Sequence, residues 1–166
     1  MTSAPRELLV VADASPLILL AKLGRLPLLT ALAEQVWVPS TVWREVVARG
    51  ENRPEIAQIV ATFSGSVRDA DPELQAAFEL QVDAGEAAAL ALAAKNRHAL
   101  LLIDDRRGRR VATASGLRHL GTLGLLLRAK RHGLIAAVAL ELAALRQHGL
   151  FVDERLVEEV LKAAGE

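Results

Sequence analysis

The sequence predicts an α/β fold, a three-layer α/β/α sandwich built on a mainly parallel central sheet. Strand-like and helix-like segments alternate along the chain, which is typical of a parallel sheet with helices on both faces. With 166 residues, 52% of them hydrophobic, the chain can bury one full core. No repeat, low-complexity tract or long linker divides it, so we expect a single domain over residues 1–166.

Four short segments are predicted to form the strands of this sheet. The first and the last are hydrophobic runs, and each ends in acid, at Asp13 or at the pair Asp104-Asp105. The third has the weakest strand character. In order along the chain, strands are predicted over residues 7–13, 35–38, 66–69 and 99–104.

Capping residues, prolines and glycines mark the boundaries of the predicted helices. A cap followed by proline starts a helix at Ser15-Pro16 and at Asp71-Pro72, and glycine ends one at Gly24 and Gly116. The last helices are expected to form a C-terminal extension, residues 136–166, packed on the domain. In order, helices are predicted over residues 15–23, 26–34, a segment from Ser40, 54–63, 72–81, 84–97, 107–115, 122–132, 135–147 and 153–163.

The composition excludes several classes of site. The chain has no cysteine, which rules out disulfide bonds, zinc bound by thiolates and a cysteine nucleophile. Its 20 basic and 20 acidic residues balance, so only a local basic patch can indicate nucleic acid. No two of the four histidines are three or four residues apart, and His132-Gly133 and His148-Gly149 are typical of helix ends.

Nothing in the sequence resembles a membrane or export segment. No apolar run approaches the ~20 residues of a membrane-spanning helix. Residues 1–7 contain a charge pair and a proline, unlike a secretory signal. We therefore expect a cytoplasmic protein with no membrane partner.

Acidic residues stand at the boundaries of otherwise apolar elements. Asp13 and the Asp104-Asp105 pair follow predicted strands, Glu45 lies inside the helix from Ser40, and Glu86 opens an alanine-rich helix. An unpaired buried carboxylate is costly and must be matched by a cation or a proton. Ligands of parallel α/β sheets bind outside the carboxyl ends of the strands. We therefore predict that these acids share a site, with one member of the adjacent pair facing it and the other supporting a loop or helix start.

Each acid also has a structural explanation. Asp13 can cap the helix that follows it, and one of the paired aspartates can cap the next helix. Glu45 can form an ion pair with Arg49, one helical turn later. Asp83-x-x-Glu86 has the pattern of a capping box, in which the glutamate satisfies a backbone donor. The capping role of Glu86 and a role in binding can coexist.

A cluster of these acids suits a divalent metal. Mg²⁺ and Mn²⁺ favour carboxylate oxygens, with water and substrate phosphate completing the shell. Two ions ~3.5–4 Å apart can activate a water and stabilise the leaving oxygen of an in-line displacement. Without metal, clustered carboxylates raise one another's pKa values, so metal binding should stabilise the fold.

A basic patch directly follows the acid pair. Guanidinium groups can hold phosphates bidentately and position a nucleic-acid backbone without reading bases. The alternative is that these arginines neutralise the nearby acids or project into solvent. The candidate nucleic-acid contacts are Ser15, Arg106, Arg107, Arg109 and Arg110.

Several motifs resemble, in order and context, those of the PIN-domain family of metal-dependent nucleases. An aspartate followed two residues later by serine opens the family pattern, and acids on two helices and at a later strand end continue it. The similarity spans about residues 8–135, and the stretch 121–135 resembles a prokaryotic PIN-related branch. The matching segments are Asp13–Ile18, Val42–Val46, Gly85–Ala93 and Ile103–Arg106.

The resemblance implies cleavage of RNA with Mg²⁺ or Mn²⁺, and VapC-like members of the family are toxins paired with an antitoxin. It favours Asp105 over Asp104 as the metal-facing aspartate and leaves Asp104 a supporting role. Two positions depart from the family pattern, because Glu86 replaces the usual aspartate and Ile103 replaces a threonine whose hydroxyl could orient an acid or a water. The residues predicted to bind metal are Asp13, Glu45, Glu86 and Asp105.

The sequence thus predicts a divalent-metal-dependent endoribonuclease. The resemblance adds the hypothesis that it is the toxin of a type II toxin–antitoxin pair. The alternative is a non-catalytic PIN-like module that binds RNA or a protein. A phosphoacceptor domain is disfavoured because Lys22 and Lys95 lie within helices and no motif supports either of them. The apolar C-terminal half suggests a homodimer.

Overall fold

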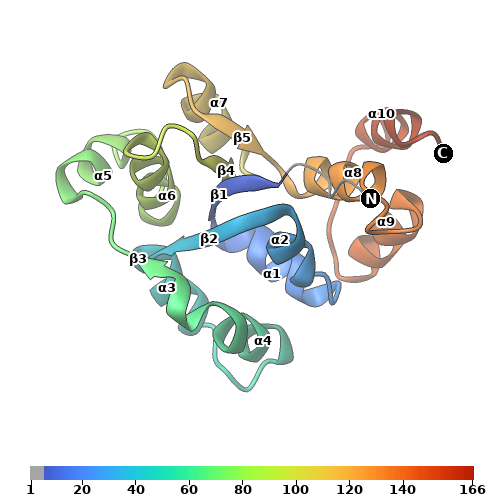
Figure 1. The fold of residues 1–166 in the computed structure, drawn as a ribbon, viewed down its shortest axis with the longest axis horizontal. Coiled ribbons are helices and arrows are strands. Elements are labelled where there is room, and N and C mark those ends of the chain that lie inside the picture. The colour runs from blue at the N-terminus through green and yellow to red at the C-terminus, as the bar shows by residue number, and fades with distance from the viewer. Residues whose placement is uncertain (1–5) are drawn as a thin grey trace.

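The structure, a computed structural model, describes residues 6–166 and confirms the predicted α/β/α architecture (Figure 1). All paired strands are parallel, and they lie in the order β3-β2-β1-β4-β5. The earliest strand therefore occupies the centre of the sheet. The strands are β1 (Glu7–Ala12), β2 (Ala33–Pro39), β3 (Val67–Arg68), β4 (Leu100–Leu102) and β5 (Arg118–Leu120).

Helices cover both faces of this sheet. In Figure 1, α5, α6 and α7 lie on one side of the strands, while α1, α2 and α4 lie on the other. The helices are α1 (Ala14–Lys22), α2 (Pro27–Leu32), α3 (Ser40–Val47), α4 (Pro54–Phe63), α5 (Pro72–Phe78), α6 (Ala84–Ala94), α7 (Arg106–Ala114), α8 (Thr122–Arg131), α9 (Val138–Gln147) and α10 (Glu154–Ala164), with a 3₁₀ turn, η1 (Ser64–Ser66), after α4.

The central strand β1 is apolar over most of its length because it contributes side chains to two hydrophobic cores, one on each face of the sheet. Because side chains alternate along a strand, Val10 and Ala12 enter one core while Leu9 and Val11 enter the other. Strand β1 is in register with β4 on one side, where Val10 lies beside Leu100. Both cores thus depend on the same six-residue strand.

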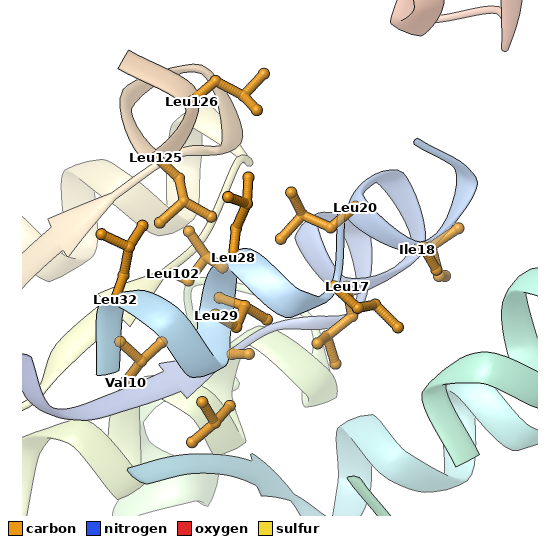
Figure 2. Close-up of a cluster of buried hydrophobic side chains, with 14 of the residues drawn as sticks. Val10, Leu17, Ile18, Leu20, Leu28, Leu29, Leu32, Leu102, Leu125 and Leu126 are labelled. Atoms are coloured by element: carbon orange, nitrogen blue, oxygen red, sulfur yellow. The ribbon is translucent and has the colours of Figure 1, made fainter. Parts of the chain in front are cut away.

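The larger core lies between the sheet and helices α1, α2 and α8. Leucines from these helices surround the strand residues Val10 and Leu102 (Figure 2). Leu17 and Leu20 of α1 are completely buried. Burial of each such side chain contributes about 1.5–3 kcal/mol. This core fixes α1, and with it the residues at the junction of β1 and α1.

The smaller core is made mainly by α6 and α7. The alanine-rich α6 buries Ala87, Leu90 and Ala93 against the sheet, and α7 adds Val111. Small side chains bring α6 close to the strands. The first turn of α6, which carries Glu86, is held against the edge of the sheet for this reason.

The structure differs from the sequence-based prediction in one whole strand and at several element boundaries. Helix α2 ends at Leu32, so residues 33 and 34, predicted to be helical, instead begin β2. Strand β5 was not predicted, because Arg118-His119-Leu120 is only three residues long and lacks an alternating apolar pattern. Helix α1 begins at Ala14, so Ser15 lies inside the first turn and is not the N-cap. The backbone N–H of Asp13 still bonds to the carbonyl of Leu102, at 3.0 Å, which places the strand-to-helix change at Asp13.

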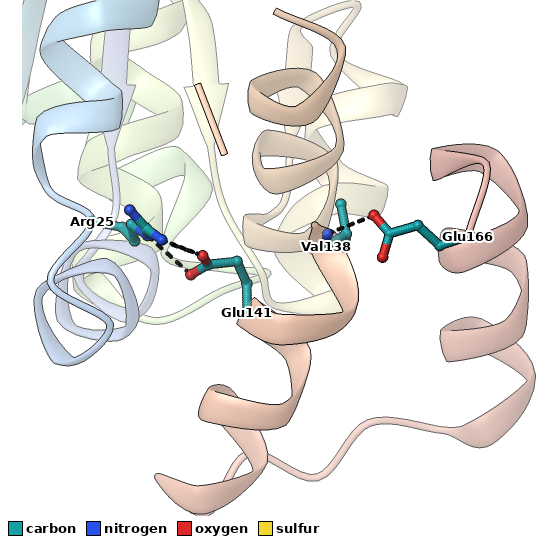
Figure 3. A network of polar contacts seen from close by, with 4 residues as sticks. All are labelled: Arg25, Val138, Glu141 and Glu166. Carbon is teal, nitrogen blue, oxygen red and sulfur yellow. Dashed lines mark hydrogen bonds and ion pairs between the residues drawn. The ribbon is translucent and has the colours of Figure 1, made fainter. Parts of the chain in front are cut away.

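Helices α9 and α10 are attached to the rest of the molecule by carboxylates. Glu141 of α9 accepts hydrogen bonds from Arg25, which follows α1, and the closest pair, Arg25 Nη2 and Glu141 Oε1, is 2.5 Å apart (Figure 3). The Glu166 carboxylate accepts from the backbone N–H groups of Val138 and Ala139, at 2.7 and 2.9 Å. These contacts connect α10 to the N-terminal end of α9, and α9 to the body.

The C-terminal apolar residues that suggested a homodimer are mostly used inside the chain. Leu126, Ile135, Val138 and Leu142 are all buried in the larger core. They therefore do not supply a dimer surface, and the homodimer stays a prediction. Among residues 6–166, no helix has both the length and the apolarity that crossing a bilayer requires. The prediction about a secretory signal concerns residues 1–7, most of which lie outside the described range.

Candidate metal centre and nucleic-acid cleft

The predicted site residues come from the carboxyl edge of the sheet and from helices that border it. Asp13 directly follows β1, and Asp104 and Asp105 follow β4 after one further residue. Because β1 and β4 are parallel neighbours, their carboxyl ends meet at this edge. Glu45 reaches the same region from α3, and Glu86 from the first turn of α6.

Asp13 is a buried carboxylate with no cationic partner among the described residues. Only 5% of the residue is exposed, and it forms no ion pair within residues 6–166. It occupies the N-cap position of α1, but its side chain makes no capping hydrogen bond, so the capping explanation does not hold for it. Burial, with the negative charges of Glu86, Asp83 and Glu45, raises the pKa of Asp13 to about 7, although the Ala14 backbone opposes the shift.

Glu86 is electrostatically connected to the same acids. Partial burial raises its pKa to about 7, and the charges of Asp83, Asp105 and Glu45 add to the shift, while the Asp83 backbone opposes it. Asp83 caps α6 by accepting from the Glu86 N–H at 2.9 Å, which is one half of the predicted capping box. No return hydrogen bond of ordinary geometry from the Asp83 N–H to the Glu86 carboxylate is found among the described residues. The cap fixes the helix start, and the Glu86 side chain remains in a field of negative charge.

Glu45 is placed by its contact with a glycine on the neighbouring helix. Its Oε2 lies 2.6 Å from the point where a Cβ on Gly85 would stand. Only glycine at this position allows the glutamate to lie so close to the backbone of α6. The alternative ion pair with Arg49 is not formed in the structure. Glu45 therefore lies against the first turn that carries Glu86.

The two adjacent aspartates have different partners. Asp104 accepts from both the backbone N–H and the hydroxyl of Thr122, each at 2.6 Å, and so holds the start of α8. Asp105 caps α7 by accepting at Oδ2 from the Gly108 N–H at 2.8 Å, as the capping alternative predicted. No hydrogen bond from a described residue reaches Asp105 Oδ1. One aspartate is thus fully engaged in support, and the other keeps an oxygen available.

An open cleft of about 850 Å³ lies beside these acids. Glu86, Asp104 and Asp105 line it, whereas Asp13 and Glu45 are not part of its lining. Helix α7 contributes Arg106 and Arg109, which are one turn apart. The other cleft residues that matter for charge and hydrogen bonding are Ser15, Arg49, His119, Thr122 and Asp153.

The predicted arginine patch is divided between two faces of α7. Arg106 and Arg109 line the cleft, whereas Arg107 and Arg110 do not. The spacing explains this division, because residues three apart share a helix face and adjacent residues do not. Arg106 and Arg109 form no ion pair within residues 6–166. The alternative that these two arginines neutralise nearby acids by direct pairing is therefore not realised.

The donor set fits a hard divalent cation in chemistry. All four predicted ligands are carboxylates, and burial, together with the charges of neighbouring acids, raises the pKa values of Asp13 and Glu86 to about 7. A bound cation would offset both contributions. In the described part of the chain, however, no three acidic or histidine side chains are already grouped as a metal-binding cluster. The acids therefore interact at a distance and do not enclose a preformed cage.

Three cleft residues were not predicted as site residues. Thr122 supplies a hydroxyl that bonds to Asp104. Ile103, which stands where the family pattern usually has a threonine, is completely buried and offers no hydroxyl. His119 lies on β5, and its Nε2 is 2.8 Å from the Thr113 hydroxyl; burial and Arg109 lower its pKa. Arg49 follows α3. His119 could not be placed because β5 was not predicted, and only the tertiary structure brings Arg49 and Thr122 into the same cleft.

Comparison with known proteins agrees with this arrangement. The model of a family described as a PIN domain matches residues 9–166, which includes every element from β1 to α10 except the first two residues of β1. No curated protein and no solved structure matched the chain. The match covers far more than half of the sequence and includes all of the acids described above. The chain therefore belongs to the PIN-domain family, whose fold is of the nuclease type.

Proposed function

We propose that this protein is a divalent-metal-dependent endoribonuclease. The observation that carries the proposal is that four acids come from separate elements at one edge of the sheet, where Glu86 and Asp105 line a cleft. The same cleft holds arginines that form no ion pair within residues 6–166. Family membership supports the same reaction class, because PIN domains are generally nucleases. The proposed metal ligands, for Mg²⁺ or Mn²⁺, are Asp13, Glu45, Glu86 and Asp105.

We assign different roles in the proposed reaction to the arginines and to Asp104. A bound divalent ion would activate the attacking water and offset charge on the leaving oxygen. Arg106 and Arg109 would hold the phosphate and align it with the acids. Asp104 would act as a positioning residue by fixing Thr122 and the start of α8 on one side of the cleft. RNA is the proposed substrate.

RNA cleavage by the purified protein and by variants of two helix-capping aspartates tests the proposal. Asp105 and Asp71 both cap helices, α7 and α5, but only Asp105 lines the cleft. Asn replaces Asp well at an N-cap, so both variants should fold. We expect cleavage of single-stranded RNA with Mg²⁺ or Mn²⁺ and none with EDTA. Asp105→Asn should lower the rate at least about tenfold, while Asp71→Asn should match the unmodified chain.

The alternative, a non-catalytic module, is favoured by one observation. No preformed metal cluster exists among the described residues, and Asp83 and Asp105 already serve as helix caps. In that case the purified protein would cleave no RNA with either metal. Asp105→Asn would then leave RNA affinity unchanged or improve it by removing a negative charge from the cleft. That combination would overturn the nuclease proposal.

We also propose, on the family resemblance alone, that the protein is a toxin with a cognate antitoxin. Expression of the chain should slow bacterial growth, and co-expression of the product of a neighbouring gene should relieve the effect. Asp13→Asn should abolish the growth defect if the toxicity comes from the proposed site. Harmless expression at a high level would contradict this proposal without affecting the biochemical one.

A further inference from the structure

The cleft beside the acids continues into an apolar region that the proposed reaction does not use. Beyond Thr122, its lining is made by Leu123 of α8, by residues 150–152, and by Leu156 and Val160 of α10. The acids and arginines line the same cleft, so the polar and apolar parts form one continuous surface.

Phe151 is the most unusual residue of this apolar region. The chain contains only three phenylalanines, and this one is 93% exposed. Burying a phenylalanine side chain contributes about 1.5–3 kcal/mol, so an aromatic ring left in solvent at the edge of a cleft forgoes that stabilisation. Folding therefore gives no reason for an aromatic residue here, whereas a ligand that covers the ring would.

The segment that carries Phe151 is anchored on both sides. Before it, the Leu150 N–H donates to the carbonyl of Leu145 at 3.1 Å. After it, Asp153 caps α10 by accepting from the Arg155 N–H at 2.8 Å. The ring is thus presented by a short connection between two fixed helix ends.

The lining of the same cleft also offers positive charge. Arg49, Arg106 and Arg109 line it, and none of them forms an ion pair with another residue of 6–166. A ligand that contacts both the arginines and the apolar residues would carry an anionic group and a flat apolar face. A nucleotide of an unpaired strand has both, because its base exposes a π-face next to the phosphate.

We propose that Phe151 is a stacking platform for a base of single-stranded RNA whose phosphate lies at Arg106 and Arg109. This inference rests on the proposed function in taking single-stranded RNA as the occupant, and it adds the side chain that contacts the base. The bases of a duplex already stack on one another and cannot cover the ring. A ring that is 93% exposed offers a flat face to a base, and arginines in the lining of the same cleft favour a ligand that also carries phosphate.

Binding of a fluorescent 12-nucleotide RNA to the full chain tests the inference. The measurement uses EDTA, so that no cleavage occurs, and compares Phe151→Ala with Leu140→Ala. Leu140 is also apolar and 66% exposed, but it lies on α9 and does not line the cleft. Phe151→Ala should weaken single-strand binding about tenfold, and Leu140→Ala should change it less than about twofold. Phe151→Trp should restore binding, and a duplex of the same sequence should bind the unmodified chain and Phe151→Ala equally.

Several results would overturn the inference. Equal losses for single strands and duplexes, or no loss in Phe151→Ala, would exclude stacking. A change in the oligomeric state of Phe151→Ala, measured by light scattering, would instead assign the ring to contact with a second copy of the chain. Undiminished RNA binding together with lost binding of an antitoxin protein would assign it to a peptide partner.

The same samples distinguish this inference from the nuclease proposal. Metal-dependent cleavage by the unmodified chain, with unchanged affinity in Phe151→Ala, would remove the stacking platform and keep the nuclease. Single-strand binding that depends on Phe151, without cleavage in Mg²⁺ or Mn²⁺, would remove the nuclease and keep the platform. Both variants replace exposed side chains, so their thermal midpoints should match the unmodified chain, and circular dichroism checks this.

Discussion

Asp13 and Glu141 are buried to nearly the same extent, with 5% and 6% of each residue exposed, but their charges are compensated differently. Glu141 accepts three hydrogen bonds from Arg25, and the pKa of Arg25 is raised mainly by this contact. Asp13 has no ion pair with any described residue, and burial raises its pKa to about 7.

The difference separates a carboxylate that holds the fold together from one kept for a ligand. Loss of one partner of a buried pair leaves an uncompensated charge, so removing the charge of Glu141 should destabilise the chain. The charge of Asp13 has no partner among the described residues, so removing it should raise the free energy of unfolding. The same change removes a proposed metal ligand. The two residues thus make opposite predictions for stability and for activity.

The largest expected effect is on activity. Asp13→Asn should lower metal-dependent RNA cleavage at least about 100-fold, because even outer-sphere partners of a metal site contribute 10- to 100-fold. Glu141→Gln should keep the specific activity of its folded fraction. Initial rates with Mn²⁺ measure both. Equal activities for Asp13→Asn and the unmodified chain would remove Asp13 from the site.

The next effect concerns pH. The raised pKa of Asp13, about 7 against 3.8, means that the folded chain holds a proton which the unfolded chain releases between these values. Stability from this group is therefore fully present below about pH 4 and falls as the pH rises to about 7, by up to about 4 kcal/mol. Glu86 shifts in the same direction, to about 7.

Urea unfolding at pH 4.5 and 7.5, in EDTA, measures this effect. Asp13→Asn should be more stable than the unmodified chain at pH 7.5, and the difference should shrink at pH 4.5. Mn²⁺ at pH 7.5 should stabilise the unmodified chain more than the variant, since binding to the folded state adds stability. A variant that is less stable at pH 7.5 would contradict the view of Asp13 as an uncompensated charge.

A smaller loss of stability is expected for Glu141→Gln. Arg25 is partly exposed, so water can take over some of its hydrogen bonds and the cost should be roughly 1–3 kcal/mol. Thermal or urea unfolding at pH 7.5 measures it. Glu158→Gln, on the exposed face of α10, is the control and should have no effect beyond about 0.5 kcal/mol. A neutral Glu141→Gln would show that this ion pair does not stabilise the fold.

The smallest effect tests the geometry of the acidic site. A Cβ on Gly85 would meet the flexible end of Glu45 at 2.6 Å, so Gly85→Ala should displace the glutamate without disrupting the core. Alanine also favours the helix by about 0.5–1 kcal/mol. We expect activity to fall about tenfold while stability is kept. In a Glu45→Ala background, Gly85→Ala should cost nothing further, and a further loss would show that it acts elsewhere.

Prediction from the sequence succeeded where local patterns carry the information. The alternation of strand-like and helix-like segments predicted the fold class correctly. The predicted helix caps and helix ends are also present, at Asp83, Asp105, His132-Gly133 and His148-Gly149. It failed at strand β5, a three-residue segment with two polar residues that forms a strand only because β4 lies beside it.

The sequence by itself determined the two-sided core and the acids at the ends of apolar runs, because both follow from spacing along the chain. Only the tertiary structure decided which acids are compensated and which residues share the cleft. The ion pair of Glu141 joins positions 116 residues apart, and Thr122 reaches Asp104 only through the pairing of β4 with β5. Burial, pKa and charge balance depend on such distant neighbours, whereas helix and strand patterns depend on near ones.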